Sequence, residues 1–414
     1  MSKVRPFKAI RPEAKYASDV VSLPYDVMNR KEAAEMASGN PYSFLHICRA
    51  EIDMPEQENV YDSSVYEKAK SNIEKYLEEG VFIREEKPAL YIYREIMDGR
   101  VQTGIVGCVS VDEYKSNTIK KHEFTRVEKE IDRINHFDVC DANTEPVFLT
   151  YRDDSRIRTI LDKFTRDNAP VYDVTAADGI KHILWVMDDE TLIEEMTSIF
   201  DEIPALYIAD GHHRSASACK VGEKRREENP DYTGDEEFNF FMAAIFPDSD
   251  LKIFDYNRVV KDLNGNSSQE FMEKIEKAGF ALEDMGEEPY YPERKHVFSM
   301  YLDGRWYRLT ASDDIVPDHI TDSLDVAVLQ NSLLEPVLGI EDPRTDKRID
   351  FVGGIRGLGE LKKRADSDMK VAFAVHPVSM DDLLAVADND MVMPPKSTWF
   401  EPKLGSGLFM HSLK

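Results

Sequence analysis

One segment constrains the fold of this 414-residue chain more than any other, and it reads ALYIADGHHRSASA (residues 205–218). Residues 205–209 form a short apolar run, which is typical of a buried β-strand. Asp210 and Gly211 then predict a turn, and the small residues at 215–218 favour a closely packed helix. Hydrophobic packing does not require two adjacent histidines and an arginine at such a corner. The segment therefore indicates a functional site as well as a fold.

Strand and helix patterns alternate along the rest of the chain and predict a mixed α/β fold. Asn29 followed by Glu32 predicts a capping box, and Asp98-Gly99 predicts a hairpin turn. Helices are expected at 30–38, 62–79 and 192–200, and strands at 43–48, 89–96, 101–111, 182–187, 205–210, 238–246 and 252–260, the last two as a pair. We find no internal repeat.

The length predicts two or three domains, because one hydrophobic core rarely supports so long a chain. The most linker-like segment is DLNGNSSQE (262–270), which is rich in Gly, Asn and Ser. We therefore expect an N-terminal and catalytic region over 1–262 that contains the histidine box. A mixed α/β region over 271–414 would contribute the loop MPPKSTWFEP.

Composition narrows the classes of partner. The net charge of −27 repels nucleic-acid phosphates over most of the surface, but it permits a small anion in a local pocket. No apolar stretch is long enough to span a membrane, and the N-terminus has no apolar core of a secretory signal. The four cysteines show no zinc-site spacing. We expect a cytoplasmic protein with a small-molecule substrate and no nucleic-acid or membrane partner. Whether it forms a homo-oligomer stays open.

The corner after the apolar run has the features of an anion site. A helix N-terminus presents free backbone N–H groups and the positive end of the helix dipole. Gly211 lets the backbone approach a ligand closely, and the Arg214 guanidinium can donate two hydrogen bonds to a phosphate. The histidines can donate to phosphate oxygens or transfer protons, and an aspartate can hold a metal ion or orient a nucleophile. We predict Asp210, His212 and His213 as catalytic residues, Gly211, Arg214 and Ser215 as cofactor-binding residues and Asp210 as the metal ligand.

A structural role is the alternative for these residues. Asp210 would then be the N-cap of the helix, and the histidines would be partly buried groups without chemistry. Several polar groups at one strand–helix corner favour the functional interpretation.

A second segment, KKHEFTRVEKEIDRINHFDVCDANTEP (120–146), is dense in side chains that can do chemistry. Arg126, Arg133 and nearby lysines can neutralise a triphosphate despite the acidic net charge, and we include His136 with them as cofactor-binding. Glu123 is our candidate for the base that takes the proton of a substrate hydroxyl. The alternative is an amphipathic helix with solvated charges.

Further motifs allow both a functional and a structural interpretation. In MPPKSTWFEPKLGSGL (393–408), Lys396 and Thr398 are predicted to bind the cofactor, and Trp399 either stacks on a base or anchors a packed loop. Asp26 in SLPYDV (22–27) either meets the amino group of a substrate or belongs to a plain turn. The chain contains no GxxxxGK[ST], GxSxG or HExxH motif.

Six motifs together resemble a bacterial and archaeal family, the conserved domain of unknown function 1015, and they recur there in the same order. This resemblance spans nearly the whole chain. Members of that family often carry an arginine where this chain has Gly405, which would remove one phosphate contact here. The motifs are SLPYDV (22–27), NPYSFLH (40–46), KKHEFTR (120–126), DRINH (132–136), ADGHHRSA (209–216) and MPPKSTWFEPKLGSGL (393–408).

The box GHHRSASA is also similar to the phosphate-binding box of the ParB and sulfiredoxin superfamily, and its DGHHR form resembles that of ParB-type free-serine kinases. This second resemblance implies a ParB/sulfiredoxin-like nucleotide-binding core with additional mixed α/β structure. It also implies ATP or ADP and Mg²⁺ as cofactors and free L-serine as the phosphoryl acceptor. A glutamate is the base in those kinases, although no motif aligns Glu123 with it.

The residues and the resemblance together predict a phosphotransferase, which moves a phosphoryl group from a nucleotide to L-serine or a similar small hydroxyl compound. Two alternatives stay open. One is a phosphatase or nucleotide hydrolase with water as the acceptor, and the other is a nucleotide-binding regulatory module without turnover.

Overall fold

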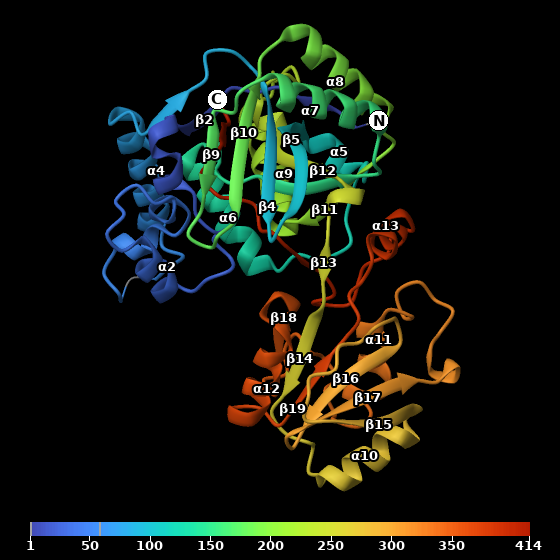
Figure 1. Cartoon of the computed structure of the whole chain (residues 1–414). Helices are drawn as coiled ribbons and strands as arrows, with labels where there is room; N and C mark the ends of the chain where they lie inside the picture. The colour runs from blue at the N-terminus through green and yellow to red at the C-terminus, as the bar shows by residue number, and fades with distance from the viewer. Residues whose placement is uncertain (1, 58) are drawn as a thin grey trace. The chain divides into compact units, whose positions relative to one another are not determined.

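The computed structural model describes residues 2–57 and 59–414, and these form two compact units. Unit 1 comprises Met1–Leu251 and Pro402–Lys414, and unit 2 comprises Lys252–Glu401. Each unit combines helices with strands, so the predicted mixed α/β class is confirmed (Figure 1). The ParB/sulfiredoxin-like character of the core stays a prediction.

The division of the chain differs from the one expected at 262–271. The chain leaves unit 1 after Leu251 and returns to it at Pro402. The linker-like segment lies inside unit 2, where Ser267 is the N-cap of α10 (Ser268–Lys277) and forms a capping box with Glu270. Its Gly, Asn and Ser residues therefore serve a turn and a helix cap, which have the same composition as a linker.

The main sheet of unit 1 has both parallel and antiparallel strands. One parallel pair places the segments that follow residues 120 and 210 side by side. The described residues form nine strands in this sheet, in the spatial order β6 (Ile119–Lys120), β11 (Leu206–Asp210), β8 (Val147–Tyr151), β12 (Phe240–Pro247), β5 (Arg100–Ser110), β4 (Leu90–Met97), β10 (Lys181–Met187) and β9 (Tyr172–Thr175), with β1 (Val4–Arg5) paired to β5. Strands β6 and β11 run parallel, with Tyr207 opposite Lys120. The residues that follow these two strands are consequently neighbours at one edge of the sheet.

Helices pack on this sheet through apolar side chains of a common core. Helices α7 (Ser155–Asp167) and α8 (Glu190–Glu202) lie beside one another at the top of Figure 1. Helix α9 (His212–Glu228) packs against α6 (Val127–Cys140). Ser215 and Ser217 of α9 are fully buried, and the Ser217 hydroxyl donates to the carbonyl of Glu130 at 3.0 Å. The prediction of a closely packed helix over these small residues is therefore confirmed.

A second core of unit 1 includes α2 (Arg30–Ala37), α3 (Leu45–Cys48) and α4 (Ser63–Glu78). The capping box of Asn29 and Glu32 is present, so that prediction and the one for α4 are confirmed. The strand predicted at 43–48 is wrong, because Leu45–Cys48 form the short helix α3 and no strand is present at 43–44. An apolar run of this length fits either a strand or a buried helix turn, and periodicity alone cannot decide between them.

The C-terminus is part of a small sheet in unit 1. This sheet has the order β3 (Phe82–Arg84), β2 (Ala9–Pro12), β21 (Met410–Ser412) and β7 (Ala142–Asn143). Because β21 pairs with β2 on one side and β7 on the other, the last residues complete a sheet whose other strands come from the first 143 residues. Backbone pairing thus fixes the return of the chain to unit 1.

Unit 2 has an antiparallel sheet with a separate core around Trp306 and Tyr301. Its strands are, in order, β15 (Phe280–Gly286), β17 (Arg305–Ala311), β16 (Val297–Leu302), β19 (Val371–Ala374), β14 (Tyr256–Val260) and β18 (Ile349–Gly353). The strand predicted at 252–260 is interrupted at Asp255 and does not pair with β12. Its first part, β13 (Ile253–Phe254), pairs instead with β20 (Trp399–Phe400).

None of the described helices is long and apolar enough to cross a membrane.

The four cysteines are free and buried.

Gly104 in β5 lies where β5 and β12 pack closely, next to the confirmed hairpin of β4 and β5. A Cβ atom on Gly104 would come within 2.4 Å of the Ile245 carbonyl oxygen and 2.8 Å of the Phe246 ring. This close approach explains a glycine inside a strand, where glycine is otherwise unfavourable.

We expect Gly104→Ala to lower the free energy of unfolding by about 1–3 kcal/mol, because the methyl group overpacks the β5–β12 contact. Urea unfolding followed by circular dichroism measures this change. The control is Gly359→Ala in α12 (Gly357–Ser367), where a Cβ meets nothing within 4 Å. An unchanged midpoint for Gly104→Ala would contradict the described packing.

Candidate functional site

The corner between β11 and α9 requires a glycine for two reasons. Gly211 is the N-cap of α9 and has φ of +92°, in the left-handed region that disfavours other residues. A Cβ on Gly211 would also lie only 3.0 Å from Nε of Arg214. The Arg214 guanidinium therefore folds back over the start of its own helix and occupies the space that a side chain would need.

Asp210 is an ionised carboxylate in direct contact with a lysine. Its Oδ2 lies 3.2 Å from Nζ of Lys403, and its Oδ1 accepts the Gly211 N–H at 2.8 Å. Burial alone would raise the pKa of Asp210, but the charges of Lys403 and Arg214 hold it well below its usual range. Asp210 does not cap the helix, since Gly211 is the N-cap, so the structural alternative for Asp210 is wrong.

The histidines join this corner to the segment after β6. Nε2 of His212 accepts the His122 N–H at 3.4 Å, and the two rings meet edge to face with centroids 4.5 Å apart. Nε2 of His213 accepts the Arg126 N–H at 2.9 Å. Because each Nε2 acts as an acceptor, the proton of a neutral ring is on Nδ1. Both predicted segments therefore meet at one place in space.

Glu123 is also part of this contact. Its Oε2 lies 3.8 Å from Nδ1 of His212, and 44% of its side chain is exposed. Burial lowers the pKa of His212 well below its usual value, and the nearby His122 lowers it further. Burial also lowers the pKa of His213. Both rings are consequently neutral at pH 7, so they can accept or donate hydrogen bonds without adding charge to the corner.

Arg214 is the buried cation of the corner, with 3% of its surface exposed. Its Nη1 donates to the Pro146 carbonyl, whereas its Nε is buried without a hydrogen-bond partner among the described residues. Burial lowers the pKa of Arg214, but Asp26, Asp210 and Glu145 raise it above its ordinary value. The Ser215 hydroxyl, which we predicted to bind the cofactor, donates to the Gly211 carbonyl within the helix at 3.1 Å.

Several buried polar side-chain atoms at this corner have no hydrogen-bond partner among the described residues. Such atoms are uncommon in folded proteins, and a cluster of them is typical of a site that takes up a polar ligand or ordered water. Among residues 2–57 and 59–414, those at the corner are both ring nitrogens of His122 and Arg214 Nε, and Glu145 Oε2 belongs to a carboxylate whose charge acts on Arg214.

The C-terminal segment contributes residues that sequence reasoning missed. Besides the contact of Lys403 with Asp210, the Ser406 hydroxyl donates to Oε1 of Glu145 at 2.6 Å. Glu145 is buried, and its Oε1 also accepts the Tyr25 N–H at 3.3 Å. Glu145 thus joins the loop of residues 22–27 to the C-terminal segment. Its position at the end of the segment 120–146 was the only signal, and Lys403 was overlooked in favour of Lys396.

Gly405 lies against the main sheet. Its N–H donates to the Tyr93 hydroxyl at 3.0 Å, and a Cβ would come within 3.0 Å of the rings and methyl groups of His182 and Val21. An arginine at this position would require these neighbours to shift. The glycine is therefore matched to the local packing of this chain.

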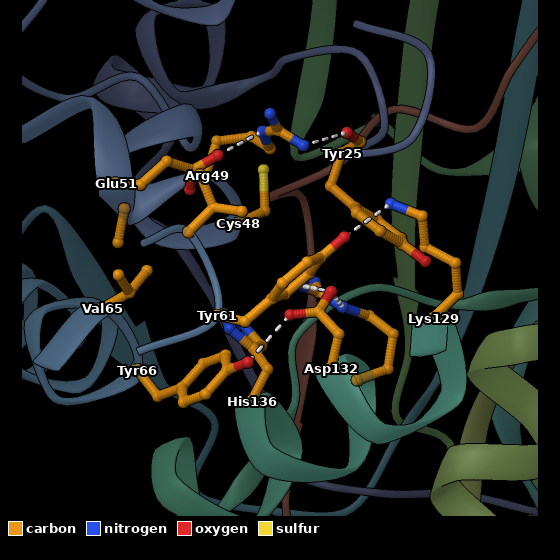
Figure 2. A pocket seen from close by; sticks show the side chains of 13 residues that line it. Tyr25, Cys48, Arg49, Glu51, Tyr61, Val65, Tyr66, Lys129, Asp132 and His136 are labelled. Carbon is orange, nitrogen blue, oxygen red and sulfur yellow. Dashed lines mark hydrogen bonds and ion pairs between the residues drawn. The ribbon is translucent and has the colours of Figure 1, made fainter. Parts of the chain in front are cut away.

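Arg133 and His136 line a separate cavity of about 130 Å³, with Lys129, Tyr61 and Tyr66 among the other lining residues (Figure 2). Arg133 pairs with Asp132 at 2.9 Å and lies over the Tyr25 ring, 3.9 Å from its centroid. None of residues 210–214 lines this cavity. The predicted cofactor-binding set is therefore divided: Arg126 contacts the histidine corner through its backbone, whereas Arg133 lies over Tyr25 and His136 packs against Tyr66 of α4.

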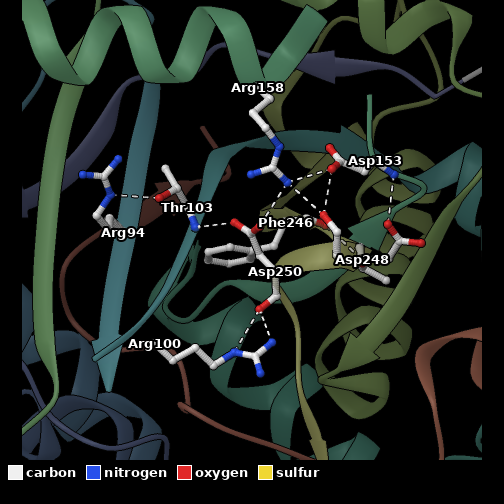
Figure 3. Close-up of polar contacts among 10 residues, drawn as sticks. Arg94, Arg100, Thr103, Asp153, Arg158, Phe246, Asp248 and Asp250 are labelled. Atoms are coloured by element: carbon white, nitrogen blue, oxygen red, sulfur yellow. Dashed lines mark hydrogen bonds and ion pairs between the residues drawn. The ribbon is translucent and has the colours of Figure 1, made fainter. Parts of the chain in front are cut away.

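Polar residues that line a second cavity, of about 180 Å³, form hydrogen bonds and ion pairs with one another (Figure 3). Asp250 of η4 (Asp248–Asp250) pairs with Arg158 at 3.0 Å and accepts the Thr103 N–H at 3.1 Å. Its carbonyl accepts from Arg100. These bonds fix the last turn of unit 1 before the chain enters unit 2.

The predicted cofactor residues Lys396 and Thr398 belong to unit 2. The Lys396 carbonyl accepts from buried Arg258 at 3.1 Å, and the Trp399 ring packs edge to face on Tyr256 with centroids 5.0 Å apart. A Cβ on Gly353 would lie 2.8 Å from the Trp399 ring. Trp399 is therefore the anchor of a packed loop. A cofactor role for Lys396 and Thr398 stays a prediction.

The part of the chain that the structure describes contains no group of three or more His, Cys, Asp or Glu side chains that could hold a metal ion. Mg²⁺ commonly binds proteins through one or two carboxylates and completes its shell with substrate phosphates and water. Asp210 fits the carboxylate of such a shared site, because it is ionised.

A family profile described as "Protein of unknown function (DUF1015)" matches residues 4–327. No protein of curated function matches the sequence. Among solved structures, "Free serine kinase in complex with AMP" is 13% identical, covers 73% of this chain and 92% of that chain, and has a TM-score of 0.37. A conserved hypothetical protein from Pyrococcus furiosus is 13% identical, with coverages of 73% and 94% and a TM-score of 0.35. "SbnI with C-terminal truncation from Staphylococcus aureus" is 12% identical, with coverages of 73% and 85% and a TM-score of 0.38.

The buried histidines predict a loss of stability in mild acid. Burial lowers the pKa of His122 and of His182 to about 4. In the unfolded chain a histidine titrates near about 6.5, so between these values the unfolded state binds more protons. Stability is therefore complete above about pH 6.5 and falls as the pH drops towards 4, by on the order of 1–3 kcal/mol for each buried ring.

Urea unfolding at several pH values measures this slope. His122→Gln should reduce it, whereas the same change at His319, which is 51% exposed, should leave it unaltered. An equal slope in the His122→Gln variant and the unmodified protein would refute this assignment.

Proposed function

The chain belongs to the DUF1015 family of proteins of unknown function, and we propose that it is a nucleotide-dependent phosphotransferase that acts on a small hydroxyl compound such as free L-serine. The observation that carries this proposal is the Asp210–Lys403 pair, 3.2 Å apart, at the N-terminus of α9 beside the buried Arg214. Two fixed cations and a helix N-terminus suit phosphates, and an ionised carboxylate suits the magnesium ion that accompanies them.

The phosphates of ATP or ADP would bind at this corner. The first backbone N–H groups of α9, the Arg214 Nε and the Lys403 ammonium would donate to phosphate oxygens. When bound, magnesium supplies charge neutralisation between the nucleotide phosphates, with Asp210 as its protein ligand. Phosphoryl transfer depends mainly on such positioning and neutralisation, and the corner provides both from residues that are already fixed.

Glu123 would serve as the base. The hydroxyl oxygen of the acceptor attacks the terminal phosphorus, the bond from that phosphorus to the bridging oxygen breaks, and the hydroxyl proton moves to the Glu123 carboxylate. The neutral His212 ring, 3.8 Å from Glu123, would orient this carboxylate through its Nδ1–H. The shortened nucleotide leaves with the bridging oxygen.

Asp26 would hold the ammonium group of an amino-acid acceptor. It is exposed, and its charge acts on both His213 and Arg214. An exposed carboxylate beside the phosphate corner suits a substrate that carries a positive amino group and a hydroxyl.

Hydrolysis is the second candidate function, and one observation favours it. With 44% of its side chain exposed, Glu123 is open to water, which could replace the hydroxyl acceptor. A binding module without turnover would need the same corner but no base.

We expect Asp210→Asn to abolish turnover while the protein stays folded, because the variant loses the charge that faces Lys403 and that would hold magnesium. The assay is mass spectrometry of protein incubated with magnesium, ATP or ADP, and L-serine. The control is Asp188→Asn, an exposed aspartate directly after the strand β10. Phosphoserine formed by the unmodified protein and absent in Asp210→Asn would support the kinase. Free phosphate without phosphoserine would favour the hydrolase, and unchanged reactants would leave the binding module.

We expect Lys403→Met to weaken nucleotide binding by about tenfold to a hundredfold, because one charge-assisted contact to phosphate is worth about 1.5–3 kcal/mol. Isothermal titration with ADP and magnesium measures the affinity. Lys163→Met on the exposed side of α7 is the control. Equal affinities for the Lys403→Met variant and the unmodified protein would remove Lys403 from the phosphate site.

A further inference from the structure

The three most exposed large hydrophobic side chains of the described residues lie together at the start of α6. Phe124 is 73% exposed, Val127 is 72% exposed and Ile131 is 52% exposed, and no other large hydrophobic side chain in the described chain exceeds 47%. Val127 and Ile131 are one helical turn apart and share a face of α6. An apolar cluster of this kind is typical of a surface that binds a ligand or a partner.

The loop that carries Phe124 is fixed to the histidine corner on both sides of this residue. His122 contacts the His212 ring, and the Arg126 N–H donates to His213 at 2.9 Å. Phe124 is two residues from each of these anchors, and a chain spans at most about 3.6 Å per residue. Its α-carbon is therefore within about 7 Å of both anchors, which is less than the length of a nucleotide.

Phe124 itself does not hold this loop in place. The Thr125 hydroxyl donates to Oε2 of Glu130 at 2.7 Å, and the two histidine contacts involve His122 and Arg126. Other residues therefore hold the loop, and a structural role does not explain an exposed aromatic side chain at this position.

We propose that Phe124, with Val127 beside it, forms the platform for the base of the nucleotide whose phosphates bind at the histidine corner. This inference rests on the proposed function. Bases stack on aromatic rings whatever their hydrogen-bonding pattern, so the platform distinguishes bases mainly by the size of their ring system. ATP and GTP should therefore bind with similar affinity, and CTP and UTP more weakly.

A second copy of the chain and a membrane fit this apolar cluster less well than a nucleotide base does. A stable contact with a second copy buries about 800 Å² on each partner, far more than three side chains provide. An anionic membrane would be repelled by the net charge of −27, and the charges next to the cluster are mixed, with Glu123 and Glu128 beside Arg126 and Lys129.

The test compares ADP with pyrophosphate, which shares its phosphates but has no base. Isothermal titration in the presence of magnesium gives both affinities for the unmodified protein and for Phe124→Ala, Phe124→Tyr and Val101→Ala. Val101 is the control, because it is 45% exposed on β5, outside the histidine corner. Sedimentation velocity records the oligomeric state of each protein.

Phe124→Ala should lose about tenfold to a hundredfold in affinity for ADP, because a stacked base is worth about 1–3 kcal/mol. It should keep its affinity for pyrophosphate. Phe124→Tyr should retain ADP binding, and Val101→Ala should match the unmodified protein for both ligands.

Each other outcome overturns a defined part of the proposal. Unchanged ADP binding in Phe124→Ala would remove the base platform and leave the phosphate site intact. Loss of both ligands in that variant would assign Phe124 a structural role instead. A dimer that dissociates in Phe124→Ala would identify the cluster as an interface between copies. If the unmodified protein binds neither ligand, the proposed function fails together with this inference.

Discussion

The ion pair of Asp210 with Lys403 is the interaction on which the arrangement of unit 1 depends. Asp210 ends a strand at a half-buried position, with 32% of its side chain exposed, and Lys403 and the buried Arg214 offset its charge. Its partner is supplied by residues 402–414, which are separated from β11 by the whole of unit 2. This pair forms only when the C-terminal segment returns to unit 1, and unit 2 is an insertion between two parts of the first unit. Strand β21 and the Ser406–Glu145 bond hold the returning segment in place.

What could be predicted from the sequence was local. The capping box at Asn29, the hairpin at Asp98-Gly99 and the strand–glycine–helix corner at 205–218 each depend on residues within a few positions of one another. Short-range rules of backbone geometry and hydrogen bonding are sufficient for such elements. The short helix at 45–48 was missed, because four buried apolar residues suit either type of element.

What could not be predicted depends on contacts between distant residues. Lys403 lies 193 positions from Asp210, and the Glu145–Ser406 contact spans 261 positions. No pattern within the motif MPPKSTWFEPKLGSGL indicates that its two halves belong to different units, with Lys396 in one and Lys403 in the other. The exit from unit 1 at Asp250 is likewise fixed by Arg100, Thr103 and Arg158, which precede it by about 90 to 150 positions.

The charges of the corner give a physical basis for the proposed binding of a small anion by so acidic a chain. Around Asp210 the buried or nearly buried cations are Lys403 and Arg214, and the histidines next to them are neutral because burial lowers their pKa. A local positive potential inside a low-dielectric corner attracts phosphate groups that are small enough to enter it. The net charge of −27 outside the corner repels a polyanion that must contact a wide surface. The same two features, a focused positive corner and an acidic exterior, therefore favour a free nucleotide over a nucleic acid.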